Sequence, residues 1–157
     1  MEIKPPPSPD LLRSPDRPVP REAAVRLRVR YCECDPMGVA HHSAYVPWLE
    51  IGRTEILRDA GVSYARLEAA GVFLAIVRLD VRYRRPACYD DLVEVRARVV
   101  GNGRVKIEHH YEVVLVERPG GRPGAPGDEL AVAASALACV DASGRPTSLP
   151  DWLSGTP

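Results

Sequence analysis

One segment of this sequence has the periodicity of a long helix. Its apolar residues fall on one face at a spacing of 3.6 residues, and they are Tyr45, Trp48, Leu49, Gly52 and Ile56. Pro47 is tolerated only in a first turn, so we expect the helix to begin near Ser43 or a little later, with Ser43 a candidate N-cap, and to end at Gly61. Gly52 costs about 1 kcal/mol of helix propensity relative to alanine, so its position in the apolar stripe predicts a close approach to the packing partner.

The other patterned segments alternate apolar and polar residues with period two, which predicts strands. The first covers 25–31, and others are expected at 78–84, 93–99, 105–115 and 130–141. Gly101-Asn102-Gly103 is a hairpin signal, and a short second helix is expected over 63–70. Strands with one polar face are typical of an antiparallel sheet that is covered on one side. We therefore predict an α+β fold in which an antiparallel five-stranded sheet wraps around one long central helix.

The length and composition limit the organisation of the chain and its partners. A chain of 157 residues suits one domain, and seven of its 16 prolines lie within residues 1–20. We expect 1–22 to be a disordered proline-rich tail, 23–143 the folded domain and 144–157 a C-terminal tail. The 21 Lys and Arg residues balance the 21 Asp and Glu residues, which argues against nucleic acid as a partner. No apolar run is long enough to span a membrane and no secretory signal is evident, so we expect a cytoplasmic protein.

Two side chains beside the expected helix start are candidates for chemistry. Asp35 lies in the preceding loop, where the unpaired N–H groups and partial positive charge of a first helical turn would stabilise an oxyanion. A carboxylate there could act as nucleophile or general base in acyl transfer, although aspartate is also common in ordinary turns. His42 could hydrogen-bond a substrate or have only a structural role. The spacing of Cys32 and Cys34 relative to His41 and His42 fits a zinc site poorly.

Basic residues near strand ends could hold phosphate groups, or could only protect a solvated sheet edge. They are Arg84, Arg85, Arg104 and Lys106. The Gly- and Pro-rich run 120–127 lacks the ending of a phosphate-binding loop, so it is expected to be a flexible connection between strands. His109 and His110 point to opposite faces of one expected strand and cannot act on one group.

Two segments carry a resemblance to a known family. Residues 31–53, YCECDPMGVAHHSAYVPWLEIGR, resemble the signature of hotdog-fold acyl-CoA thioesterases of the 4-hydroxybenzoyl-CoA thioesterase and YbgC-like family. Residues 83–92, YRRPACYDDL, resemble the strand-to-strand turn of that family. The similarity extends from about residue 25 to residue 141 and agrees with the order of strands and helix predicted above. Subunits of this architecture commonly meet at the outer face of the sheet, so we expect a homodimer or homotetramer.

The resemblance also implies an activity. Asp35 matches the catalytic carboxylate, as nucleophile or as base for water. His42 matches the position whose backbone N–H polarises the thioester carbonyl, and Gly38 matches the glycine that shapes the loop. Coenzyme A, as part of the acyl-CoA substrate, would place its phosphates near the four basic residues named above, and no other cofactor or metal is required. His41 stands where an aromatic residue is common, which leaves the preferred acyl group open.

We therefore expect hydrolysis of an acyl-CoA thioester to a free acid and coenzyme A. The alternative is a non-catalytic module of the same fold that binds acyl-CoA or an acyl carrier without releasing thiol. A dehydratase or hydratase is less well supported, because the paired Asp and His motif expected for that group is not evident. Whether the acyl group is aromatic, short or long stays open.

Overall fold

The computed structural model describes residues 13–154. Its long elements are strands β1 (Glu22–Arg28), β2 (Phe73–Tyr83), β3 (Leu92–Asn102), β4 (Lys106–Glu117) and β5 (Glu129–Val140), and helix α1 (Tyr45–Asp59). The short helical elements are η2 (Tyr31–Glu33), η3 (His42–Ala44), α2 (Tyr64–Ala69) and α3 (Asp151–Ser154). Most of the expected proline-rich tail falls on residues 1–12, which lie outside the described residues.

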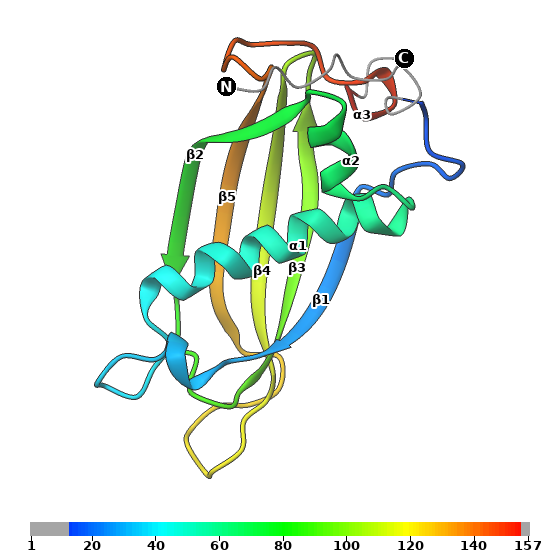
Figure 1. The fold of residues 1–157 in the computed structure, drawn as a ribbon. Helices are drawn as coiled ribbons and strands as arrows, with labels where there is room; N and C mark the ends of the chain where they lie inside the picture. The colour runs from blue at the N-terminus through cyan, green and yellow to red at the C-terminus, as the bar shows by residue number, and fades with distance from the viewer. Residues whose placement is uncertain (1–12, 155–157) are drawn as a thin grey trace.

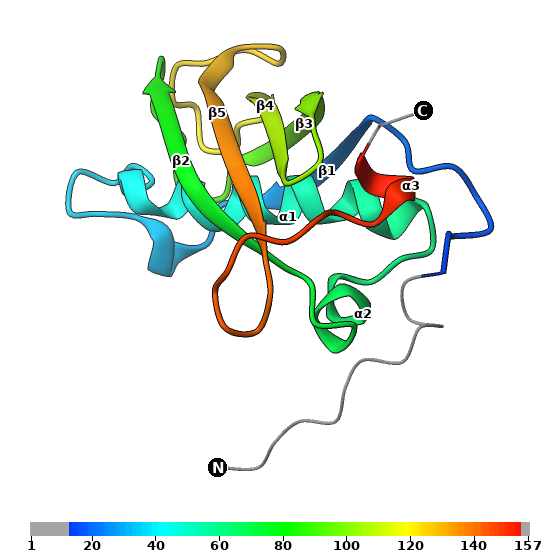
Figure 2. The same cartoon turned by 90° about the horizontal axis from the view of Figure 1, so that it is seen from above.

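The five strands form one sheet in the order β1-β3-β4-β5-β2, and every neighbouring pair is antiparallel. The sheet curves around α1, which crosses its concave face (Figure 1, Figure 2). The helix packs mainly against β1 and β3. This arrangement confirms the predicted α+β fold, with an antiparallel five-stranded sheet wrapped around one long helix.

The helix is held by the stripe that its sequence predicts. All five stripe residues are buried against the sheet, and Trp48 is the largest of the fully buried side chains. A Cβ atom at Gly52 would come within 2.9 Å of Cγ1 of Val95 on β3. The glycine therefore allows a closer approach of helix and sheet than any side chain would, as expected.

Three loops meet at one end of the sheet (Figure 1). They are residues 29–44 before α1, residues 84–91 between β2 and β3, and residues 118–128 between β4 and β5. The backbone N–H of Val29 donates to the carbonyl of Asp91 (2.9 Å). The β3–β4 hairpin, α2 and α3 lie at the opposite end. The fold thus brings three segments that are distant in sequence to the end where α1 begins.

Some element boundaries differ from the prediction for local reasons. Tyr31 leaves the first strand and is exposed in η2. Ser43 does not cap the long helix; instead its own N–H is accepted by the side chain of His41 at the start of η3. Strand β2 begins at Phe73, five residues earlier than expected. The alternation pattern missed residues 73–77 because they are continuously apolar, although they lie on an edge strand.

The C-terminal part also packs more closely than the sequence pattern indicates. Residues 144–154 fall in the expected tail, yet Leu149 and Leu153 are buried in a second apolar cluster with Leu57 and Leu67. Strand β5 is 12 residues long and lies between β4 and β2, so it is an inner strand of the sheet. These contacts close the end of the molecule opposite the helix start.

Candidate active site

Asp35 lies in a tight turn between β1 and α1. The backbone N–H of Gly38 donates to the carbonyl of Asp35 (2.9 Å), and the N–H of Asp35 donates to the carbonyl of Val39 (2.9 Å). The N–H of Met37 donates to Oδ1 of Asp35 (2.8 Å). Gly38 has a φ of 75°, a left-handed conformation that favours glycine. The turn holds the carboxylate through one oxygen, and the other oxygen has no hydrogen-bond partner within residues 13–154.

A buried carboxylate fastens this loop to the helix. Oε1 of Glu33 accepts a hydrogen bond from Nε1 of Trp48 (2.9 Å), and the same carboxylate accepts a backbone and a guanidinium N–H of Arg30 (2.7 and 2.8 Å). The carbonyl of Glu33 accepts the N–H of His41 (2.8 Å). Burial raises the pKa of the Glu33 carboxyl, but these hydrogen bonds outweigh it and hold the pKa below its ordinary value. The two ends of the Asp35 loop are thereby tied together and to α1.

The entry to the helix is a 3-10 turn that runs directly into α1. Nδ1 of His41 accepts the N–H of Ser43 (3.3 Å) and lies 2.7 Å from its Oγ. The carbonyl of His42 accepts the hydroxyl of Tyr83 (3.0 Å), whose ring packs edge-on against Tyr45. Among the described residues, the N–H of His42 has no hydrogen-bond partner. A free N–H at the positive end of a helical segment is suited to stabilise an oxyanion.

Asp35 and the helix entry share one surface hollow. Its lining comes from both segments and includes Cys34, Asp35, His41, Ser43, Ala44 and Pro47. The Asp35 carboxylate therefore lies beside the first helical turn. The ring of His42 packs against the ring of His41, with centroids 3.9 Å apart, and is not part of this lining. The residues on either side of His42, His41 and Ser43, line the hollow with Asp35.

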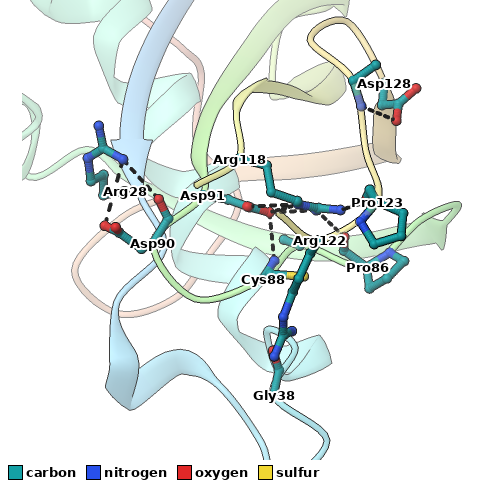
Figure 3. Close-up of polar contacts among 12 residues, drawn as sticks. Arg28, Gly38, Pro86, Cys88, Asp90, Asp91, Arg118, Arg122, Pro123 and Asp128 are labelled. Carbon is teal, nitrogen blue, oxygen red and sulfur yellow. Dashed lines mark hydrogen bonds and ion pairs between the residues drawn. The ribbon is translucent and has the colours of Figure 1, made fainter. Parts of the chain in front are cut away.

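A buried ion pair supports the loops around the turn (Figure 3). Nη2 of Arg118 lies 2.6 Å from Oδ2 of Asp91, and the two side chains are only 6% and 1% exposed. Asp91 also accepts the N–H of Cys88 (2.7 Å), and Arg118 donates to the carbonyls of Pro86 (2.8 Å) and Pro123. Hydrogen bonding to the Asp91 carboxylate raises the pKa of Arg118. The pair joins the 84–91 loop to the 118–128 loop.

The 118–128 loop also brings Arg122 over the Asp35 turn. Nη1 of Arg122 donates to the carbonyl of Gly38 (2.7 Å), and Figure 3 shows the side chain reaching across to it. Arg122 and Asp35 line a second hollow together with the exposed rings of Tyr31 and Tyr89, whose centroids are 5.6 Å apart. Two hollows therefore flank Asp35, one at the helix entry and one beneath this arginine.

The four basic residues expected to hold phosphates lie at two ends of the sheet. Arg84 and Arg85 follow β2, at the end that carries Asp35. Arg104 and Lys106 lie at the β3–β4 hairpin, at the opposite end. Arg84, Arg85 and Lys106 each pair with a carboxylate. The structure does not bring the four together, because an antiparallel strand carries the chain from one end of the sheet to the other.

Several candidate site residues were missed by sequence reasoning. Arg122 lies in the run that was interpreted as a flexible connection, and no local pattern links it to Gly38 across 84 positions. Glu33 and Ser43 fall within the quoted family motif, which was the available signal, but their contacts depend on how the loop folds back. Within the described chain, no cluster of three or more His, Cys, Asp or Glu side chains is arranged to hold a metal ion. None of the helices in this part of the chain has the length and apolar character needed to cross a bilayer.

A known protein family matches most of the chain. A protein-family model described as the thioesterase-like superfamily matches residues 29–155. The matched range includes the Asp35 turn, the helix and four of the five strands. The chain belongs to the thioesterase-like superfamily. The resemblance of residues 31–53 and 83–92 to this family is therefore confirmed.

Individual members of the family support the same assignment. The chain is 30% identical over 132 residues to YneP of Bacillus subtilis (strain 168), named as a candidate acyl-CoA thioesterase, which covers 80% of this chain and 88% of YneP. It is 36% identical over 91 residues to YbgC of Escherichia coli O6:H1, named an acyl-CoA thioester hydrolase, which covers 58% of this chain and 68% of YbgC. The crystal structure of DHNA-CoA thioesterase from Staphylococcus aureus is similar with a TM-score of 0.74 and 26% identity, covering 83% of this chain and 85% of that one. The hotdog fold is thus confirmed.

Proposed function

We propose that this thioesterase-family chain hydrolyses acyl-CoA thioesters at the turn that carries Asp35. The proposal rests chiefly on the hollow shared by the Asp35 carboxylate and the helix entry. Thioester hydrolysis needs a nucleophile or base beside a group that stabilises the developing oxyanion. Asp35 lines this hollow together with His41 and Ser43, the neighbours of the proposed oxyanion donor His42. The substrate class is taken from the relatives, because YneP and YbgC are named for acyl-CoA thioesters.

Two chemical routes are compatible with this geometry. As nucleophile, the Asp35 carboxylate attacks the thioester carbon, the C–S bond breaks, and the coenzyme A thiolate leaves and takes a proton from solvent. Water then hydrolyses the resulting anhydride and restores Asp35. As general base, Asp35 instead takes a proton from water while the water oxygen attacks the same carbon; the C–S bond then breaks, and the coenzyme A thiolate leaves and takes up a proton. Both routes use only protein groups and water.

The helix entry has the same part in either route. Attack on the carbonyl carbon places negative charge on its oxygen, and the N–H of His42 would donate to that oxygen. The partial positive charge at the start of the helix acts in the same direction. Gly38 contributes by allowing the tight turn, since its positive φ would strain any other residue.

Coenzyme A is proposed to extend from Asp35 toward Arg84 and Arg85, which lie at the same end of the sheet. Their pairing with carboxylates leaves N–H donors for phosphate, because a guanidinium has five. Arg104 and Lys106 are about 35 Å away along strands of 11 or 12 residues. They would contact only a coenzyme A molecule bound by another subunit.

A homodimer or homotetramer is proposed on the basis of the exposed edge of the sheet. Ile76 and Val77 on edge strand β2 are 42% and 61% exposed. Residues 73–77 of this edge strand are continuously apolar, and an exposed apolar strand edge is a template for pairing with another chain. Sedimentation analysis of the full chain tests this proposal, and a monomer at micromolar concentration would contradict it.

Thiol release by Asp35→Asn tests the catalytic proposal. The substitution keeps the acceptor for the Met37 N–H, so the variant should fold as the parent does, while turnover of aromatic, short-chain and long-chain acyl-CoAs should fall at least about 100-fold. Asp59→Asn, at the exposed far end of α1, is the matched control and should retain full activity. Undiminished turnover by Asp35→Asn would remove this residue from the mechanism. Saturable binding by the parent without thiol release would instead favour the non-catalytic module.

A further inference from the structure

A second cavity lies beneath the C-terminal half of α1, at the end of the sheet away from Asp35. Its volume is about 290 Å³. Most of its wall is apolar and comes from α1, β2, the β3–β4 hairpin and α3; the apolar members include Ile56, Leu57, Leu74, Val99, Ile107 and Leu153. The cavity is thus large enough for the body of a small organic molecule.

The polar part of the wall carries one sign of charge. Arg53 from α1 and Arg21 from the segment before β1 line the cavity, and no aspartate or glutamate among the described residues does. The Arg53 side chain is only 14% exposed and donates a hydrogen bond to Glu50 (2.9 Å), whose carboxylate is in solvent. A guanidinium has five N–H donors, so this bond uses a fraction of them. The cavity therefore combines apolar walls with a partly buried cation.

His109 provides a second polar group in the same wall. It lies on the face of β4 that packs toward α1, is 5% exposed, and its Nδ1 has no hydrogen-bond partner among residues 13–154. Burial, together with the charge of Arg53, lowers the pKa of His109 to about 4, so its ring is neutral at pH 7. A buried polar atom without a partner destabilises the unliganded protein. Nδ1 itself is covered by protein, but the residue lines the cavity, so its ring adds a polar group to the wall.

This cavity is separate from the candidate active site. It shares no lining residue with either hollow at Asp35. Arg53 lies eight residues beyond the first residue of α1, Tyr45, which corresponds to about 12 Å along the helix axis. A ligand here would not occupy the position beside Asp35.

We propose that this cavity is a binding site for a carboxylic acid with an apolar body, whose carboxylate contacts Arg53 and His109 and whose body lies among the apolar walls. The assignment follows from charge complementarity, since an amphipathic anion matches a cationic group set into apolar surface. A neutral imidazole presents one donor and one acceptor, so with Nδ1 covered as the acceptor, His109 would donate its Nε2–H to the carboxylate. Free acids of this class are also the products of acyl-CoA hydrolysis, but the site does not depend on Asp35 being catalytic.

Isothermal titration calorimetry at pH 7 tests the proposal, with octanoate as the anionic probe and octanamide as an uncharged probe of the same length. Octanoate should saturate one site per chain with a Kd of about 1 mM or below. Octanamide should bind at least about tenfold more weakly, because it lacks the charge that Arg53 recognises. The proposal would be overturned if the two probes bound with equal affinity. It would also be overturned if octanoate did not bind at concentrations tenfold above the expected Kd.

Octanoate binding by substituted proteins tests whether the acid binds in this cavity. Arg53→Gln should weaken octanoate binding about tenfold, whereas Arg58→Gln, an exposed residue five positions along α1, should leave it unchanged. His109→Leu should weaken binding and raise the unfolding temperature, because it removes a buried atom without a partner. If Arg53→Gln fails to fold by circular dichroism, the exposed Arg21→Gln replaces it and should weaken binding severalfold.

Asp35→Asn separates this proposal from the proposed enzymatic function. It should bind octanoate with the affinity of the parent. If Asp35→Asn lost octanoate binding while Arg53→Gln kept it, octanoate would bind at the Asp35 turn, and the proposal of a second site would be wrong. Loss of activity in Asp35→Asn with binding retained would support both.

Discussion

Arg122 donates a hydrogen bond of 2.7 Å to the carbonyl of Gly38, so the loop between β4 and β5 closes onto the turn that carries Asp35. The two residues are 84 positions apart. Arg122 thereby acts on the candidate active site through the backbone of the turn. Under the proposed function it is expected to position Asp35, and the buried pair of Arg118 and Asp91 holds the same loop in place.

Replacing Arg122 should lower activity without unfolding the protein. In Arg122→Gln the turn keeps its own hydrogen bonds but loses the one at Gly38, so we expect kcat/KM for an acyl-CoA to fall about tenfold through misplacement of the carboxylate. The free energy of unfolding should change by less than about 0.5 kcal/mol, because Arg122 is exposed. Arg145→Gln, another exposed arginine, serves as control. Parent-like kcat/KM in Arg122→Gln would show that the turn does not need this contact.

Breaking the buried ion pair should destabilise the whole chain. Asp91→Asn leaves the buried guanidinium of Arg118 without a counter-charge, and we expect a loss of about 3–5 kcal/mol in urea unfolding. Arg28→Gln is the comparison, because its ion pairs with Asp90 and Glu117 are exposed and should contribute less than about 1 kcal/mol. Similar losses for the two variants would contradict the importance assigned to burial.

A methyl group at position 52 should be destabilising despite the better helix propensity of alanine. Gly52→Ala gains about 1 kcal/mol of propensity, but its Cβ would meet Cγ1 of Val95 at 2.9 Å in the packed core. Overpacking of this kind costs about 1–3 kcal/mol, so we expect net destabilisation in chemical unfolding. The same substitution should cost less in a Val95→Ala background, where the opposing methyl groups are absent. An equal cost in both backgrounds would argue against this contact.

His109 should make stability depend on pH below neutrality. Its pKa is lowered to about 4 by burial and by Arg53, whereas the unfolded value is about 6.5. Between these pH values the unfolded chain binds a proton that the folded chain does not. The free energy of unfolding therefore falls as the pH falls, by up to about 1.4 kcal/mol per pH unit. The stability advantage of His109→Leu over the parent should therefore grow by about 1.6 kcal/mol from pH 6.5 to pH 5. His110→Leu, on the outer face of β4, is the control, and a constant difference for His109→Leu would contradict this account.

The folded elements were largely predictable, because their signals are local. The stripe from Tyr45 to Ile56 identifies α1, and the alternation in the later segments identifies β3, β4 and β5. The prediction was wrong at Ser43, because α1 has no side-chain cap and His41 caps the preceding 3-10 turn η3. It was also wrong at the start of β2, where residues 73–77 of an edge strand show no polar face. Burial of Leu149 and Leu153 was also missed, since two apolar residues do not make a periodic pattern.

The sequence by itself determined the class of each long element, the close approach at Gly52 and the turn at Asp35, since each depends on residues within a few positions of one another. The tertiary structure alone decided that Arg122 meets Gly38, that Arg84 and Arg104 lie at opposite ends of the sheet, and that His109 faces a cavity beside Arg53. These relationships follow from the strand order β1-β3-β4-β5-β2 and from the curvature of the sheet around α1. Local hydrophobic periodicity encodes neither the strand order nor the curvature, because the strand order is set by the long-range pairing that buries the most apolar surface.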